Sequence, residues 1–386
     1  MRLNEWSFWQ RGVFWGAGFL IAGILGVLLL AYSGFSSVAA SRGHPAWLNW
    51  FLETGMRQSV QFNSGEFTPP PLDDQGLIAL GAGHFQGNCA ACHGAPGEPV
   101  NPTYDHMLPS PPKLADYADR WNDEELHWIS LHGIQYAGMP AWPAEGREDE
   151  VWTVVAFLRI LPDLDPARYV ALANGNAALH AQDAAALTNQ GRMAANLTAC
   201  ARCHDTPDAA PTSSHTPRLA GQSAAYLRQA LVEYRNGLRQ SGFMAPVAAE
   251  LDEKQIDLLS DYYASISSPP FSTPTIASTQ SVQRGAQLVA QGDPSAGIPP
   301  CAVCHGHTSL EQYPRLAGQP AEYLKAQLFL WQRGGRAQSG AGKLMADIAN
   351  RMTEEQIKDS AAFYDSLGRM PRNGASDAPA TTREGD

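Results

Sequence analysis

The sequence predicts an all-α protein in which three small tandem domains follow one N-terminal transmembrane helix. Three observations support this prediction. Residues 12–32 form an uncharged apolar run, long enough to cross a hydrocarbon core of about 30 Å as a helix. A Cys-x-x-Cys-His motif occurs three times in the remainder, and apolar residues recur at helical spacing after the motifs. The length of 386 residues leaves room for this number of domains.

The composition excludes several classes of protein. Hydrophobic residues make up 44% of the chain and charged residues 17%, which fits neither a disordered chain nor one embedded wholly in a membrane. The formal net charge is −11, whereas nucleic-acid-binding domains are usually basic, so we expect no nucleic-acid partner. Six cysteines are too few for a disulfide scaffold in a chain of this length, so their spacing is more informative than their number.

The apolar run has the features of a membrane anchor. Arg2 and Arg11 precede it and Arg42 is the only basic residue soon after it, which favours a cytoplasmic N-terminus. Aromatic residues lie at both ends, as in an interfacial belt: Trp6, Phe8, Trp9, Phe14, Trp15, Tyr32 and Phe35. A cleaved signal peptide is the alternative, because residues 37–39 resemble a cleavage site. The run exceeds the roughly 7–15 apolar residues of a signal peptide, so we expect an uncleaved anchor in a bacterial inner membrane.

All six cysteines belong to three identical motifs: Cys89, Cys92 and His93; Cys200, Cys203 and His204; Cys301, Cys304 and His305. This pattern is typical of covalent c-type haem attachment. Two thiols separated by two residues can add to the two vinyl groups of a porphyrin, and the adjacent histidine then provides an imidazole ligand to the iron. Half a zinc site and a redox-active Cys-x-x-Cys pair are the alternatives, but neither requires a histidine after every second cysteine. The sequence therefore predicts three covalently bound haem c groups.

A six-coordinate haem iron needs a second ligand, and methionine raises its potential relative to histidine. Met139, Met244 and Met345 follow the histidines of their motifs by 46, 40 and 40 residues. We predict these three methionines as iron ligands.

Other residues compete for this role. Aligning the segments that start at Met244 and Met345 pairs Met352 with the apolar Leu251, so we expect Met352 in the core. In the first unit Met107 is too near its motif. His132 is the alternative to Met139 and would give the iron two histidine ligands.

The second and third motifs are 101 residues apart, as are Met244 and Met345, which indicates a duplicated domain. The segment Pro-Arg-Leu-Ala-Gly-Gln occurs in both copies, from Pro217 and from Pro314, and the more distant first unit keeps Pro112 before a basic residue. We expect this proline carbonyl to orient the ligating histidine through its free ring nitrogen, as is usual for metal-bound histidine. An ordinary loop turn is the alternative.

Each unit is expected to end with an amphipathic helix. Two of these helices place apolar residues at helical spacing: Val151, Val154, Val155 and Leu158, and in part Ile256, Leu259 and Tyr263. Thr353 and Gln356 form a capping box at the start of the last helix. Before the first motif, Gly81 and Phe85 lie four residues apart, and a glycine there permits the first and last helices of the domain to cross closely.

These features divide the chain into a cytoplasmic N-terminus (1–11), a transmembrane helix (12–35), a periplasmic linker (36–70), a first domain (71–165), a linker (166–181), a second domain (182–268), a linker (269–279), a third domain (280–369) and a disordered tail (370–386). Units of about 90 residues are small for a protein-only core. We expect a buried haem to supply much of each core, so that each domain is unfolded without it.

On these motifs the chain resembles class I cytochromes c over roughly residues 71–370. The second and third units are similar to the two halves of the dihaem cytochrome c4 family, on the two Arg-Leu-Ala-Gly-Gln segments, the methionine segments and residues 292–301. The first unit, with Gly-Met-Pro-Ala-Trp-Pro at 138–143, is similar to single cytochrome domains found with bacterial oxidases and dehydrogenases. The resemblance implies three tandem class I cytochrome c domains with His/Met-ligated iron. Asp205 departs from it, because Gly94 and Gly306 follow the histidine in the other units, and we expect an altered turn there.

The resemblance implies electron transfer rather than enzymatic catalysis. We expect a periplasmic relay of a respiratory chain, between a quinol-oxidising complex or soluble donor and a terminal oxidase or soluble acceptor. The alternative is the cytochrome subunit of a periplasmic flavin- or quinoprotein dehydrogenase. A haem enzyme such as a peroxidase needs an open iron position, which three credible methionines do not leave.

The net charge is concentrated in one domain. Residues 71–165 hold 15 acidic and 4 basic side chains, a difference of −11, in runs that include 123–125 and 148–150. We expect this first domain to dock a basic redox partner, since charge steers association. A solvated face is the alternative. His84 and His307 lie near motifs and are expected at the surface.

Overall fold

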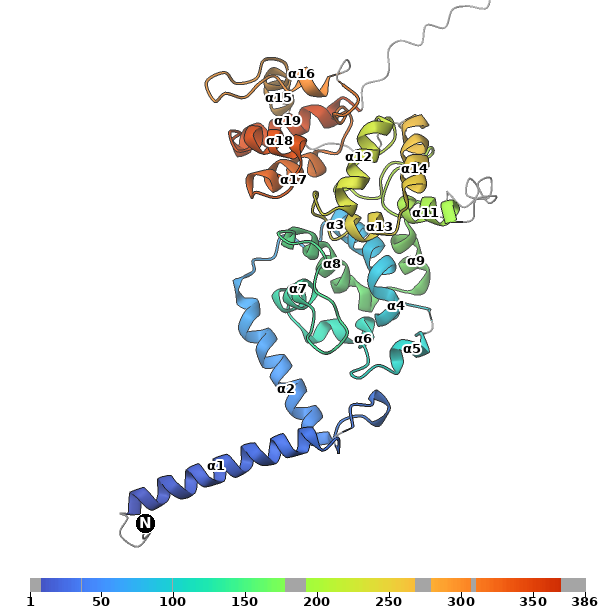
Figure 1. Cartoon of the computed structure of the whole chain (residues 1–386). Helices are drawn as coiled ribbons and strands as arrows, with labels where there is room; N and C mark the ends of the chain where they lie inside the picture. Colours follow the sequence, from blue (N-terminus) through green and yellow to red (C-terminus); the bar gives the residue numbers. More distant parts are fainter. Residues whose placement is uncertain are drawn as a thin grey trace, which may run out of the picture.

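The computed structural model describes residues 8–35, 37–98, 100–177, 192–267, 279–306 and 310–368. Helices dominate these ranges, which contain no strand beyond two isolated bridges, Ile134 with Met139 and Asp293 with Ile298. The all-α prediction is confirmed. The helices form three groups, one for each predicted domain, and the long α1 extends away from them near the N-terminus (Figure 1).

Two long helices precede the first motif. The described side chains of α1 (Phe8–Tyr32) are all exposed, and by length and composition it is the one helix of the described ranges able to cross a membrane. The stretch expected as a linker, 36–70, instead contains α2 (Ala46–Asn63). The end of α2 packs on the first domain, because Val60 is fully buried and Arg57 donates a hydrogen bond to the Tyr117 hydroxyl at 3.2 Å.

The first domain contains α3 (Gln75–His84), a π-helical turn (Phe85–Cys89), α4 (Ala90–His93), α5 (Pro102–Asp105), α6 (Leu114–Tyr117), α7 (Asp123–His132) and α8 (Glu148–Ile160). Short 3-10 turns occur at Ala40–Arg42, Ser64–Glu66, Ala118–Arg120 and Leu161–Asp163. The predicted close crossing of the first and last helices is confirmed. A Cβ added to Gly81 of α3 would lie 2.0 Å from the Thr153 carbonyl oxygen of α8, so only glycine fits there.

The segment 166–181 was expected as a linker, and that prediction is wrong for its first half. Residues Pro166–Asn174 form α9, whose Tyr169 and Ala173 are fully buried in the core of the first domain. Asp165 caps the helix through its side chain, and a proline follows at the first helical position, where its missing N–H costs nothing. Residues 178–191 lie outside the described ranges.

The last three helices follow one order in the second and third domains. The second contains α11 (Arg192–Ala201), α12 (Ala224–Arg235), α13 (Met244–Ala249) and α14 (Glu253–Ser265). The third contains α15 (Thr279–Gln291), α16 (Ala302–His305), α17 (Ala321–Gln332), α18 (Gly340–Ala349) and α19 (Glu354–Ser366). Its α15 crosses α19 at Gly285, where a Cβ would lie 2.0 Å from the Asp359 carbonyl oxygen. The third domain thus repeats the close crossing seen in the first domain.

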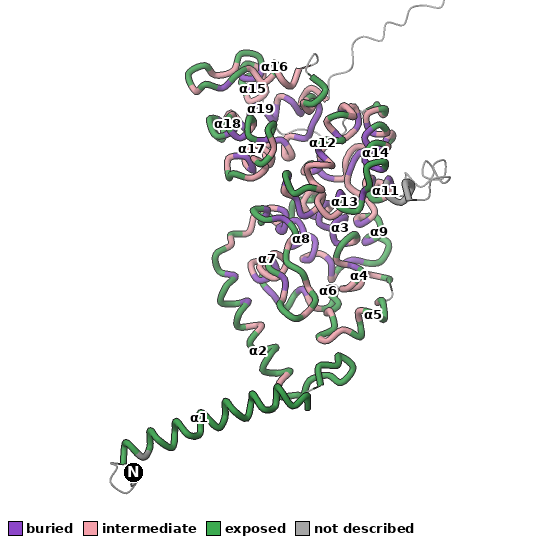
Figure 2. The backbone as a smooth tube through the Cα atoms, viewed as in Figure 1, coloured by how far each residue is buried: buried purple, intermediate pink, exposed green. Residues whose placement is uncertain are grey.

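The predicted core faces are confirmed. All the residues singled out on α8 and α14 are buried, and the capping box of Thr353 and Gln356 begins α19. Met352 is 7% exposed and packs with Leu288, Ile298 and Ile357, as its alignment with the buried Leu251 predicted. Buried segments concentrate inside the three helical groups, whereas α1 is exposed along its whole described length (Figure 2).

Candidate haem sites

In each domain the motif histidine is fixed by a proline carbonyl. The Nδ1 atoms of His93, His204 and His305 lie 2.8, 3.0 and 2.9 Å from the carbonyl oxygens of Pro112, Pro217 and Pro314. This contact was predicted from the recurring proline and is confirmed in all three domains. It leaves Nε2 of each ring available to a metal ion and fixes the ring orientation.

The electrostatic surroundings of these histidines favour the form that binds metal. Burial lowers the pKa of all three imidazoles, which keeps the rings neutral near pH 7. Neutral imidazole is the ligating form.

Three motif cysteines lack the lowered thiol pKa of a redox-active pair. Burial raises the pKa of the Cys89 and Cys200 thiols to about 12 and that of Cys203 to about 11. Reactive Cys-x-x-Cys pairs have a lowered thiol pKa instead, because the thiolate is the nucleophile. These three thiols therefore give no support to the thioredoxin-like alternative.

A large apolar cavity joins the second and third domains. Its volume is about 900 Å³, and the cysteine and histidine side chains of both motifs line it. The two predicted ligands Met244 and Met345 also line this cavity, on the side of α13 and α18. The structure thus brings each methionine and its motif to one shared hollow, with Met352 and Leu251 as part of its apolar wall.

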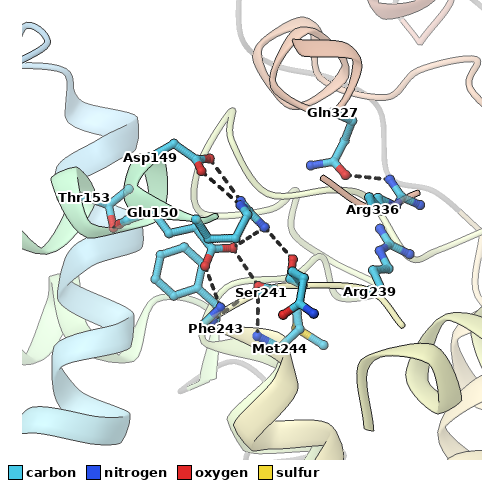
Figure 3. Close-up of polar contacts among 12 residues, drawn as sticks. Asp149, Glu150, Thr153, Arg239, Ser241, Phe243, Met244, Gln327 and Arg336 are labelled. Atoms are coloured by element: carbon cyan, nitrogen blue, oxygen red, sulfur yellow. Dashed lines mark hydrogen bonds and ion pairs between the residues drawn. The ribbon is translucent and has the colours of Figure 1, made fainter. Parts of the chain in front are cut away.

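A buried arginine in this cavity matches the anionic groups of a haem. Arg239 is 4% exposed, its guanidinium lies 4.5 Å from the ring centroid of Tyr234, and it donates to the Tyr323 hydroxyl at 3.2 Å. No ion pair with a carboxylate is found for Arg239 among the described residues, and its Nε has no hydrogen-bond partner there. Arg336 of the third domain lies near it (Figure 3). Since an uncompensated buried charge is costly, the two carboxylate groups that a haem carries would fit here.

The repeated Arg-Leu-Ala-Gly-Gln segments join the second and third domains. Gln319 accepts from the backbone N–H of Arg218 and donates to its carbonyl oxygen, both at 2.9 Å. Gln222 makes the matching pair with Arg315, at 2.9 and 2.8 Å. The sequence shows the repeat, but it does not show that the glutamine of each copy bonds the backbone of the other domain.

The first domain carries its candidate methionine in a turn. Ile134 donates from its backbone N–H to the Met139 carbonyl oxygen at 3.2 Å, and Met139 is half-buried. Met107 lies beside this turn, because a Cβ on Gly138 would come within 2.5 Å of its Cε. The position of Met107 in the sequence does not indicate that it lies near the turn that carries Met139. His132, the other candidate, is exposed at the end of α7 with its ring against Trp128.

Asp205 explains the departure from glycine in the second motif. It is fully buried, and its carboxylate accepts from the backbone N–H groups of Leu219 and Ala220 at 2.7 and 3.1 Å. These residues directly follow Pro217 and Arg218. Through these two hydrogen bonds Asp205 connects the loop that orients His204 to the Cys-x-x-Cys-His motif.

His84 was expected at the surface, and that prediction is wrong. It is 8% exposed, with its ring centroid 4.8 Å from that of Trp142 and 4.9 Å from that of Phe243 in the second domain. The contact between two domains buries it, which a sequence pattern within one domain does not reveal. His307 lies outside the described residues.

The acidic runs of the first domain are largely engaged in the fold. Glu125 is 8% exposed and completes a capping box with Asn122, while Asp123 pairs with Arg159. Both runs begin helices, α7 and α8, where acidic residues are favoured by the helix dipole. The side chains proposed to steer a partner are therefore partly used as helix caps and internal ion pairs.

Comparisons with known proteins agree with this geometry. Residues 76–158 match the family described as "Cytochrome C oxidase, cbb3-type, subunit III". The "Thiosulfate dehydrogenase electron acceptor" of Stutzerimonas stutzeri is 32% identical over 193 residues, which cover 49% of this chain and 88% of that protein. The chain belongs to the cytochrome c family. Cytochrome c4 of Thiocapsa roseopersicina is 30% identical over 175 residues, covering 44% of this cytochrome and 88% of the relative.

Solved structures give similar matches to this cytochrome. Cytochrome c4 of Acidithiobacillus ferrooxidans is 33% identical, with a TM-score of 0.39, and the match covers 44% of this chain and 98% of that one. Thiosulfate dehydrogenase from Marichromatium purpuratum is 31% identical, with a TM-score of 0.42, over 51% of this chain and 41% of that one. On the family match and the sequence relatives, the chain is a multihaem c-type cytochrome with class I cytochrome c folds, and its function is electron transfer. Family membership implies covalently bound haem c.

Proposed function

We propose that this cytochrome is a membrane-anchored, trihaem electron carrier of a bacterial respiratory chain, with its haem domains in the periplasm. The observation that carries the proposal is the threefold repetition of one arrangement, a Cys-x-x-Cys-His motif whose histidine is held by a proline carbonyl. When bound, a haem supplies a reversible one-electron centre, while the protein sets its potential through ligands, burial and hydrogen bonds.

The proposed ligand set assigns two cysteines, one histidine and one methionine to each haem. Cys89, Cys92, Cys200, Cys203, Cys301 and Cys304 form the covalent attachments. The iron ligands are His93 with Met139, His204 with Met244, and His305 with Met345. The position of Met244 and Met345 on the wall of the cavity supports the second and third pairs.

The proposed anchor is α1. Its 25 residues correspond to a length of about 37 Å at 1.5 Å per residue, which exceeds the hydrocarbon thickness of a bilayer. Anchoring confines the carrier to the membrane plane, where it meets membrane complexes by lateral diffusion. A chain lacking residues 1–35 is expected in the soluble fraction, and recovery of that shortened chain with the membranes would exclude α1 as the anchor.

The domain order suggests the route of the electron. The second domain contacts the first through the pair Arg147 and Gln240 and the third through the glutamine pairs. We propose that the second haem links the other two and that external partners act at the ends. The net charge of −11 on residues 71–165 still favours a basic partner at the first domain, although part of that charge is paired internally.

The proposal has two forms, which differ in the protein that donates electrons to this cytochrome. A relative 32% identical is named as the electron acceptor of a thiosulfate dehydrogenase, which favours a role as the redox subunit or acceptor of a periplasmic dehydrogenase. The cytochrome c4 relatives favour a freely acting carrier between a quinol-oxidising complex or soluble donor and an oxidase or soluble acceptor.

Purification of the detergent-solubilised protein with its companions tests both forms. Mass spectrometry of the purified material would identify a dehydrogenase in the first case and an oxidase or quinol-oxidising complex in the second. A haem assay on the same sample should give three haems per chain, all low-spin. One high-spin haem that binds cyanide would contradict the proposed role as a pure carrier.

A further inference from the structure

The first domain contacts the loop that carries Met244 of the second domain. Residues 240–244 form this methionine loop, which lies against the start of α8 (Figure 3). First-domain side chains contact each of residues 240–243 by a hydrogen bond or a ring contact. The loop is therefore part of the interface between the two domains.

Glu150 is the centre of these contacts. It is 4% exposed, and its Oε1 accepts from the Ser241 hydroxyl at 2.7 Å while Oε2 accepts from the Gly242 N–H at 2.5 Å. Arg147 neutralises the carboxylate, with Nη1 at 2.7 Å from Oε1, and donates to the Gln240 carbonyl oxygen at 2.7 Å. The Trp142 indole N–H also donates to Oε2, at 3.3 Å. A buried carboxylate with a charged partner and three further donors is a fully satisfied site, and such sites hold one geometry firmly.

Ser241 connects Glu150 to the methionine. Its O–H donates to Glu150, and the same hydroxyl oxygen accepts from the backbone N–H groups of Phe243 and Met244, both at 3.2 Å. Since α13 begins at Met244, this hydroxyl fixes the first turn of the helix that carries the sulfur. The chain of contacts therefore runs from the first domain to the backbone of Met244.

Tight packing supports the polar contacts. A Cβ on Gly242 would lie 2.2 Å from the Trp142 ring, so the indole rests directly on the loop backbone. Phe243 meets Trp142 edge to face with ring centroids 5.6 Å apart. The methionine loop cannot shift toward the first domain without displacing this indole.

The third domain provides an internal comparison. The offset of 101 residues between Met244 and Met345 places Gly342 at the position of Ser241, so the third domain has no equivalent hydroxyl. Instead, α18 begins at Gly340 and is capped by Ser339 of the same domain. The second methionine loop is thus held from outside its domain and the third from within.

We propose that the first domain is a positioning clamp for the second haem, in which Glu150 acts through Ser241 to hold Met244 at the iron. This inference rests on the proposed ligation of the second haem by Met244. It predicts that loosening the clamp weakens the bond between the methionine sulfur and that iron and lowers the potential of the second haem, because methionine ligation raises haem potential. We expect no change at the first and third haems, because the segments that carry their proposed methionine ligands are held by contacts within their own domains.

The test uses the full-length haem-loaded protein and four variants. Glu150→Gln removes the carboxylate charge, and Ser241→Ala removes only the bridging hydroxyl. Glu148→Gln is the matched control, since it makes the same charge change two residues earlier on α8 at an exposed residue. Met244→Leu reports the spectrum of the protein without the proposed ligand. The readouts are the methionine-to-iron charge-transfer absorption of the oxidised protein and the midpoint potentials from a spectroscopic redox titration.

The expected result is a specific loss in two variants. Glu150→Gln and Ser241→Ala should each weaken the charge-transfer absorption by at most the contribution of one of the three haems, and each should lower one midpoint potential. Glu148→Gln should have the absorption and potentials of the unmodified protein. Wild-type absorption and potentials in both clamp variants would overturn the inference. If Met244→Leu itself leaves the absorption unchanged, the proposed ligation fails separately. If Ser241→Ala changes the helix content but leaves all midpoint potentials unchanged, the role of Ser241 is merely structural, and this result would also overturn the inference.

Discussion

Gly83 of the first domain lies directly against Cys203 of the second, since a Cβ on Gly83 would stand 3.1 Å from the cysteine sulfur. The first domain therefore covers the attachment motif of the second. Ala201 within that motif is fully buried, whereas Ala302 at the same position of the third motif is exposed. We expect external proteins to exchange electrons with the first and third haems rather than with the second.

Replacing Gly83 with leucine should separate the first two domains. The side chain has no room on the Cys203 side, and overpacking of this kind costs about 1–3 kcal/mol. Hydrogen exchange of residues 199–206, followed by mass spectrometry, should become several-fold faster. Gly55→Leu is the control, because nothing lies within 4 Å of a Cβ at Gly55 of α2. Equal exchange in wild type and Gly83→Leu would show that the two domains are not in contact at this point.

Removing one glutamine should weaken the junction of the second and third domains. Gln319→Ala leaves the buried N–H and carbonyl groups of Arg218 without their partners, at a cost of about 1–3 kcal/mol. Urea denaturation followed by the optical spectrum should show a lower midpoint. Gln229→Ala, at an exposed residue of α12 whose side chain donates to Glu233 of the same helix, should leave the midpoint unchanged. Equal midpoints for the two variants would argue against the glutamine pairs as a stabilising contact.

The stability of the contact between the first and second domains should depend on pH through His84. Burial lowers the pKa of His84 from 6.5 to about 4, so the folded protein keeps this ring neutral where the unfolded chain binds a proton. The unfolded state then holds more protons between pH 6.5 and about 4, and the free energy of unfolding falls as pH decreases through that window. The full loss is about 3 kcal/mol and is complete near the lower limit.

A histidine-free variant isolates this effect. His84→Phe keeps an aromatic ring between Trp142 and Phe243, and its stability should decline less between pH 6.5 and 4 than that of the wild type. His106→Phe, at an exposed residue, is the control. Denaturant midpoints at several pH values provide the measurement. Parallel pH curves for wild type and His84→Phe would falsify the assignment to His84.

Two methionines of the third domain should respond differently to the same substitution. Met345→Leu is expected to remove the charge-transfer absorption of one haem and lower its midpoint potential, because leucine cannot ligate iron. Met352→Leu keeps the volume of a buried core residue and should cost less than about 1.5 kcal/mol without changing the spectrum. The reverse pattern would identify Met352 as the ligand.

Features that depend on local chemistry were predictable from the sequence. The capping box at Thr353, the buried face of α8 and the glycine crossing at Gly81 each follow from residue spacing within one element, and the structure confirms them. The proline carbonyl that orients each histidine was also predictable, because the same proline recurs in three copies. A single proline in a loop would not predict a contact with histidine, but its occurrence at the same stage of all three domains does.

Features that depend on contacts between domains were not predictable. The burial of His84 and Glu150 arises where the first domain meets the second, an interface that occurs once and has no repeat to compare. A run of acidic residues such as 148–150 has the same appearance whether it is solvated or buried against a partner. The helix α9 was missed because its buried residues, Tyr169 and Ala173, are too few to give a clear helical period.

The reciprocal glutamine contacts have a consequence for self-association. Residue pairs that exchange the same bonds in both directions are the mark of an isologous, two-fold interface, which normally joins two identical subunits. Here the two halves belong to one chain, so each half meets its counterpart at the high effective concentration set by covalent linkage. The self-complementary surface is closed within a single molecule, and the pair of domains needs no second copy and no threshold concentration to form.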